Sequence, residues 1–264
     1  MRKNVAAVLA LSAVLAIGAT ALAKAPSTRI HVGNLILTFG GDVSPKAMPR
    51  NDYVPVTTSI FGKIKTDDGT HPSALREAVV DIDKDVKINA RGLPSCRAGQ
   101  LEAQPTPAAK KICGKTILGS GNAHVEIEFP EQPPITIASP LTVFNGGERG
   151  GKVTLLIHVF ITVPVPAAIV TQVTIQRKGS GVHSIARVPV IAGGSGSTLD
   201  FKFKLGRTYT DKGKKVGYFE ARCPDGKFRA TARKTIFKNE AKVPGVVPTT
   251  TLAGSLFVPC APKG

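Results

Sequence analysis

Hydrophobic and polar residues alternate with a period of two along most of the chain. The clearest case is the segment 152–163, in which every second residue from Val153 onward is apolar and the intervening positions include Leu156, His158 and Phe160. A period of two indicates a β-strand, because successive side chains point to opposite faces. Since both faces of this segment are largely apolar, the pattern predicts a central strand that is covered on both sides.

Weaker alternation recurs in eleven other segments, which are separated by turns rich in glycine and proline. These segments are residues 29–39, 54–65, 78–82, 123–129, 135–144, 168–177, 183–190, 198–205, 216–221, 228–237 and 249–258. About a dozen short strands predict an all-β fold, either a sandwich or a barrel, and we expect an antiparallel β-sandwich of jelly-roll or Ig-like general architecture. Asp225-Gly226 is the best candidate for a hairpin turn. Helix is expected only near residues 72–77 and between residues 96 and 113.

The first 23 residues depart from this pattern. Arg2 and Lys3 precede an apolar stretch that is rich in alanine and ends in Ala21-Leu22-Ala23. This order predicts a signal peptide over residues 1–23, and hence a secreted or cell-envelope location. The competing interpretation is an uncleaved membrane anchor, which the small residues at the end of the stretch disfavour. No later segment approaches the ~20 apolar residues of a spanning helix, so we expect no transmembrane segment after cleavage.

Residues 24–264 are expected to form a single mature domain, because no long linker interrupts them. The alternative is a division into two smaller β domains. Its boundary would fall at residues 145–151, the glycine-rich stretch Asn145-Gly146-Gly147-Glu148-Arg149-Gly150-Gly151. That stretch has the length of an ordinary loop, which favours one domain.

Four cysteines, Cys96, Cys113, Cys223 and Cys260, follow the predicted signal peptide. An even number in an oxidising compartment indicates disulfides, and three pairings are possible. Pairing Cys96 with Cys113 and Cys223 with Cys260 joins near neighbours, so we expect two disulfides of this connectivity. A zinc site is disfavoured because the chain has no Cys-x-x-Cys spacing.

The positive charge of the chain indicates what class of ligand the protein binds. The chain holds 35 Lys and Arg against 18 Asp and Glu, and residues 201–242 alone hold thirteen basic and four acidic residues. A surface of this kind attracts polyanions. Export makes nucleic acid an improbable partner, so the expected ligand is an anionic cell-wall polymer. The alternative is a solvated surface whose lysines keep a strand edge from aggregating. The predicted contact residues are Lys202, Lys204, Lys212, Lys214 and Lys215.

One group of residues could support catalysis. His124, Glu126 and Glu128 alternate with apolar residues, so a strand would place an imidazole and two carboxylates on one face. This row could serve an extracytoplasmic hydrolase, but it equally fits the solvated face of a half-buried strand. The five histidines have no metal-ligand spacing and no nucleophile motif is present, so we expect a non-catalytic protein without a cofactor.

Five short strings carry a resemblance to known sequences. They are ARGLPSC (90–96), FPEQPP (129–134), TVPVPAAIV (162–170), VPVIAGGSGS (188–197) and ARCPDGKF (221–228). In these strings the chain resembles uncharacterised exported proteins of high-GC Gram-positive bacteria. The resemblance implies a shared secreted β fold with paired cysteines, and it implies no activity.

Overall fold

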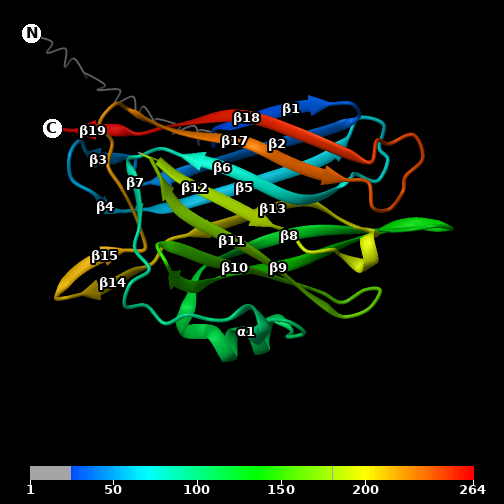
Figure 1. Ribbon diagram of the computed structural model, residues 1–264, viewed down its shortest axis with the longest axis horizontal. Coiled ribbons are helices and arrows are strands. Elements are labelled where there is room, and N and C mark those ends of the chain that lie inside the picture. The colour runs from blue at the N-terminus through cyan, green and yellow to red at the C-terminus, as the bar shows by residue number, and fades with distance from the viewer. Residues whose placement is uncertain (1–24, 180) are drawn as a thin grey trace, which may run out of the picture.

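The computed structural model describes residues 25–179 and 181–264, and it is built almost entirely of β-strands (Figure 1). The predicted signal peptide, residues 1–23, lies outside the described residues. The strands are β1 (Ser27–Val32), β2 (Leu35–Ser44), β3 (Ala47–Pro49), β4 (Val54–Pro55), β5 (Thr57–Thr66), β6 (Ala74–Ile82), β7 (Val86–Ile88), β8 (Ile117–Phe129), β9 (Gln132–Arg149), β10 (Lys152–Ile161), β11 (Ala167–Lys178), β12 (Gly181–Arg187), β13 (Gly196–Leu205), β14 (Thr208–Asp211), β15 (Lys214–Gly217), β16 (Phe219–Ala221), β17 (Lys227–Lys238), β18 (Thr249–Pro259) and β19 (Ala261–Lys263). The helix α1 (Thr106–Cys113) and short 3₁₀ turns at Ala98–Gln100, Gly114–Thr116 and Ala192–Gly194 complete the fold.

Twelve of the strands form one antiparallel sheet in the order β1-β2-β5-β13-β8-β9-β10-β11-β12-β6-β17-β18. The two edge strands of this sheet, β1 and β18, lie beside each other (Figure 1). The Thr28 hydroxyl on β1 donates a hydrogen bond to the Ser255 carbonyl on β18 at 2.7 Å. Gly254 allows this approach, because a Cβ there would lie 2.6 Å from Cδ1 of Ile30. The expected antiparallel all-β fold with little helix is confirmed. The sheet, however, is nearly closed and barrel-like rather than clearly a two-sheet sandwich.

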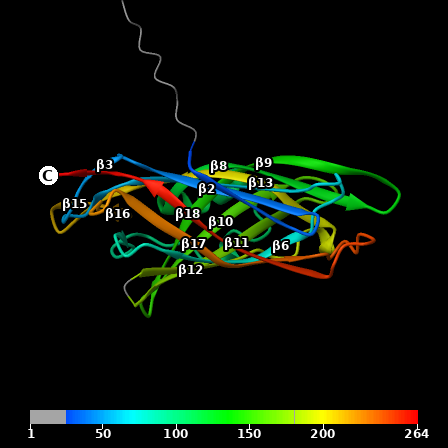
Figure 2. The same ribbon diagram turned by 90° about the horizontal axis from the view of Figure 1, so that it is seen from above.

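The interior of this sheet is filled by the apolar residues that the alternation predicts. The register places Ala123 of β8, Phe201 of β13 and Gly62 of β5 opposite one another, so the side chains of Ala123 and Phe201 share the inner face and the Phe201 ring covers Gly62. The larger inner cluster is formed mainly by β8 to β13, and a smaller one is formed by β2, β5, β17 and β18 around Phe237. Viewed from above, the molecule is elongated and flat (Figure 2).

The connection between β7 and β8, which contains α1, covers part of the outer surface of β9 and β10. Leu101 and Ala109 of this connection pack with Phe144 of β9 and Leu156 of β10 in a separate buried cluster. The outer side of β10 is therefore covered as well as its inner side, which confirms the central strand predicted for this segment.

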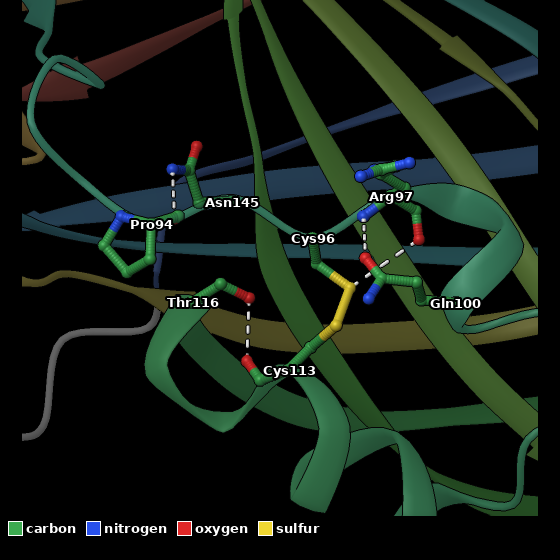
Figure 3. Close-up of a disulfide and its surroundings, with 7 residues drawn as sticks. All are labelled: Pro94, Cys96, Arg97, Gln100, Cys113, Thr116 and Asn145. Atoms are coloured by element: carbon green, nitrogen blue, oxygen red, sulfur yellow. Dashed lines mark hydrogen bonds between the residues drawn. A yellow bond between two sulfur atoms is a disulfide. The ribbon is translucent and has the colours of Figure 1, made fainter.

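Both expected disulfides are present, and both join the expected partners. The disulfide between Cys96 and Cys113 joins two positions within the connection that contains α1 (Figure 3). Cys223 is linked to Cys260 and ties the segment after β16 to the end of β18. No cysteine among the described residues is free.

Several local predictions are wrong. The expected strands 54–65 and 216–221 are each divided between two strands of different sheets, β4 and β5 in the first case and β15 and β16 in the second. Residues 29–39 form the hairpin β1–β2 instead of one strand, because the chain turns at Gly33-Asn34. Asp225-Gly226 connects β16 and β17, which belong to different sheets, so it makes no hairpin. Residues 74–77 lie in β6 instead of a helical turn. At the boundary considered for two domains, β9 and β10 form an antiparallel pair, while the number of domains stays a prediction.

Candidate functional site

The five lysines predicted to contact a polyanion fall into two groups. Lys202 and Lys204 lie on the outer face of β13 and are exposed. Lys202 is opposite Asn122 of β8, and Lys204 is opposite Ser120 of the same strand. Because they are two residues apart on a strand, both ammonium groups leave the sheet on the same side, as the spacing predicts.

The other three lysines lie on the hairpin of β14 and β15, which projects from one end of the sheet (Figure 1). Asp211 pairs with Lys214, so Lys212 and Gly213 form the two-residue turn. Both turn residues have positive φ, 49° for Lys212 and 77° for Gly213, as in the turns that match strand twist. Positive φ is costly for a lysine. The sequence therefore has a charged residue at a position where asparagine or glycine fits better.

None of the five lysines forms an ion pair with any of the described residues. Other basic residues are engaged: Lys46 pairs with Asp42, and Arg222 pairs with Asp85. The five exposed ammonium groups are consequently available to an external anion without breaking an internal bond.

The hairpin belongs to an end of the sheet that is rich in basic residues. We define the basic end as the connections 45–56, 83–116 and 206–226 together with residues 260–264. These segments hold fifteen basic and seven acidic residues. These segments therefore hold eight more basic than acidic residues, an excess that attracts anions to this end.

The opposite end has little positive charge and several exposed valines. We define the valine-proline end as the loops 33–34, 67–73, 130–131, 162–166, 188–195 and 239–248, which hold one basic and four acidic residues. Figure 1 shows these loops together at the right of the molecule. Exposed valines next to a proline occupy three of them, at Val163, Val165, Val190 and Val247. In the sequence these valines are up to 84 positions apart, so only the strand order shows that they share a surface.

His124, Glu126 and Glu128 lie on the outer face of β8, while Ala123, Val125 and Ile127 are buried. They do not act as one group. His124 Nδ1 is 2.8 Å from Oδ1 of Asp200 on β13, whereas the carboxylates of Glu126 and Glu128 lie 2.8 and 3.7 Å from Nδ1 of His71.

His71 is the residue that sequence reasoning missed at this position. Its side chain is 2% exposed, and it comes from the loop between β5 and β6. Its Nε2 has no hydrogen-bond partner within the described residues, and neither does Oε2 of Glu128. His71 is 55 positions from Glu126 in sequence, so no local signal could have predicted the contact.

His158 is fully buried on β10, as its position on a strand with two covered faces indicates. Its Nε2 is 2.9 Å from the carbonyl of Gln104, in the connection that contains α1. Burial lowers the pKa of His158 and outweighs the opposing effect of this hydrogen bond. The imidazole therefore stays neutral at physiological pH and fixes the connection to the sheet.

Within residues 25–179 and 181–264, no set of three or more His, Cys, Asp and Glu side chains is arranged to hold a metal ion. In the same residues, no helix has the length and apolar character needed to cross a membrane. No protein-family model, curated protein or solved structure matches the chain.

Proposed function

We propose that the protein is a non-catalytic extracytoplasmic binding domain whose basic end holds an anionic polymer of the cell envelope. The observation that carries the proposal is the exposed hairpin with Lys212, Lys214 and Lys215, which lacks internal ion pairs among the described residues and projects from the basic end. Two disulfides support an oxidising location. The finer likeness to a jelly-roll or Ig-like sandwich stays a prediction.

A polymer fits this surface better than a small ligand does. The hairpin lysines are exposed, so each gains little from a single anion in water. A chain with many anionic groups engages several ammonium groups at once and releases the small ions around them, which multiplies weak contacts into useful affinity. Lys202 and Lys204, on the strand that leads toward the hairpin, extend the same contact.

The test is retention of the purified protein on cell wall that carries a phosphodiester polymer. Raising the salt from about 50 to 200 mM should weaken retention at least about tenfold, because the contacts are exposed and screened. The variant K212E/K214E/K215E should weaken it by a similar factor at low salt.

The matched control is K65E/K238E/K242E. It makes the same change of charge with three exposed lysines on the other side of the molecule, toward the valine-proline end. Retention of this variant should stay within about twofold of the wild type. This small loss reflects the lower net charge, which changes equally in both variants. Equal losses in the two variants, or retention that salt does not change, would overturn the proposal.

The alternative, a hydrolase that uses Glu126, Glu128 and His124, stays a prediction, and the geometry does not favour it. Both carboxylates face one buried imidazole, His71, and His124 is 42% exposed and paired with Asp200. Two cavities in the described residues are lined by other side chains.

A further inference from the structure

A shallow cavity of about 250 Å³ lies on the outer face of β10, β11 and β12, apart from the lysine hairpin. Its lining consists of Lys152, Thr174, Gln176, His183, Ile185 and Arg187. Among these six residues there is no carboxylate. Two of the side chains are permanently cationic and three others can donate hydrogen bonds.

The antiparallel register brings these residues together. Lys152 of β10 is opposite Gln176 of β11, and Gln176 is opposite His183 of β12. Thr174 and Ile185 form the next opposed pair on the same face. The inward residues Val153, Ile175 and Val182 are buried, so the lining residues point outward. Five of them, on three strands, thus surround one small area of the sheet.

Asp81 orients the imidazole of the cavity. Oδ1 of Asp81 is 2.6 Å from Nδ1 of His183, and its other oxygen accepts a hydrogen bond from Nε of Arg233. Burial raises the pKa of Asp81, but the hydrogen bonds from His183 and Arg233, together with their charges, lower it by more. The carboxylate therefore stays ionised, is engaged through both oxygens and leaves Nε2 of His183 for a ligand.

The positive charges of Lys152 and Arg187 are not neutralised by close ion pairs among the described residues. Lys152 has no ion pair among the described residues. Nε of Arg187 is 3.7 Å from Oε2 of Glu77, which is too long for a good hydrogen bond, and Glu77 also faces Lys234 at 3.8 Å. The region around the cavity is accordingly short of negative charge.

We propose that this cavity binds a tetrahedral oxyanion, the phosphate or sulfate group of an ester. Lys152 and Arg187 supply charge from two sides, and Arg187 can bind two oxygens at once. Thr174 and Gln176 donate hydrogen bonds to the remaining oxygens, and His183, whose Nδ1 faces Asp81, donates from Nε2 when its ring carries both protons. This is a separate site from the lysine hairpin, and it stands even if the polymer proposal fails.

The experiment is an NMR titration of the protein with inorganic phosphate at constant ionic strength, following the imidazole signals of all five histidines. We expect a saturable shift at His183, while His31, which is distant in sequence and lies on β1, serves as an internal reference. Sulfate in place of phosphate distinguishes the two ester sources. Acetate tests for a general preference for anions, and should bind at least about tenfold more weakly because it offers only two oxygens.

The variant K152Q/R187Q removes both cations at exposed positions, so the fold should survive. It should weaken phosphate binding at least about tenfold. The variant K212E/K214E/K215E should leave the shift at His183 unchanged, which separates this site from the polymer surface. A shift that does not saturate, that acetate reproduces at equal concentration, or that survives K152Q/R187Q would overturn the proposal.

Discussion

The connections at the two ends of the sheet are held in place by different interactions. The basic end has long connections, residues 83–116 and 206–226, and both disulfides fasten them. The longest loop of the valine-proline end is residues 239–248, where the side chain of Asn239 accepts a hydrogen bond from the Val243 amide and donates to two carbonyls. Short loops are ordered by prolines and local hydrogen bonds, while long ones here have covalent links.

Charge follows the same division. The end with the larger excess of positive charge is also the end with both disulfides. Like charges at short distances repel, and the repulsion grows as salt is removed. The covalent links therefore hold together segments that electrostatics alone would push apart. This leaves their lysines free to meet an external anion.

Removing the disulfides should have the largest effect on the stability of the basic end. The double variants C96S/C113S and C223S/C260S open loops with sequence separations of 17 and 37 residues. The chain-entropy model gives losses of about 3 and about 4 kcal/mol in the free energy of unfolding. Urea denaturation measures both losses. If neither variant loses stability, the disulfides are not what orders the basic end.

Two asparagines, Asn145 and Asn239, test how much hydrogen bonds contribute to ordering the connections at the two ends. Asn145 is fully buried, donates to the Pro94 carbonyl at 2.9 Å and accepts from the Tyr218 hydroxyl at 3.1 Å. N145A should cost roughly 2–3 kcal/mol, because it leaves buried polar groups unpaired. N239A at the other end should cost about 1 kcal/mol, since water can replace its partners. Chemical denaturation compares the two, and a larger loss for N239A would contradict the expectation.

Two lysines with positive φ, Lys212 at the basic end and Lys242 at the other, sharpen the comparison. K212N and K242N should each stabilise the protein by about 0.5–1 kcal/mol, because asparagine adopts this backbone conformation more readily than lysine. Only K212N should also reduce retention on cell wall. Thermal denaturation and the retention assay give both results, and equal retention of the two variants would speak against a role for Lys212.

The smallest expected effect is the pH dependence of stability due to Asp68, which lies at the valine-proline end. Hydrogen bonds from the Thr70 side chain, the Thr70 backbone and the Asn34 side chain lower the pKa of Asp68 to about 2. Because the folded-state pKa lies below the unfolded value, its stabilising effect is complete above about pH 5 and disappears as the pH falls toward 2. Carboxyl NMR signals should show this midpoint. In T70A the midpoint should rise toward the ordinary value of about 4, and an unchanged midpoint would refute the assigned cause.

Local features of the fold could be predicted from the sequence, because they depend on neighbouring residues. The central strand at Lys152–Ile161 is visible in its apolar residues on both faces, and the disulfides follow from pairing near neighbours. Whether the strands form a sandwich or a nearly closed barrel could not be predicted. Both arrangements bury one face of each strand and so produce the same alternation.

The candidate sites show the same limit. Exposure of Lys212, Lys214 and Lys215 follows from their local sequence. The cavity of Lys152, His183 and Arg187 depends on the pairing of β10, β11 and β12, and the Asp81 contact depends on β12 lying beside β6, which is distant in the chain. The contact of His71 with Glu126 likewise depends on how a loop crosses the sheet. A single sequence contains no pattern that specifies such registers.

The contact between Thr28 and Ser255 joins residues that are 227 positions apart. Folds with contacts between such distant residues tend to form slowly, because the entropy cost of closing the loop comes before the gain from the contact. β18, which lies beside β1, is needed to cover this edge of the sheet, and a chain cut before residue 249 would leave the edge of β1 uncovered. Such a truncated product should associate with itself through that edge.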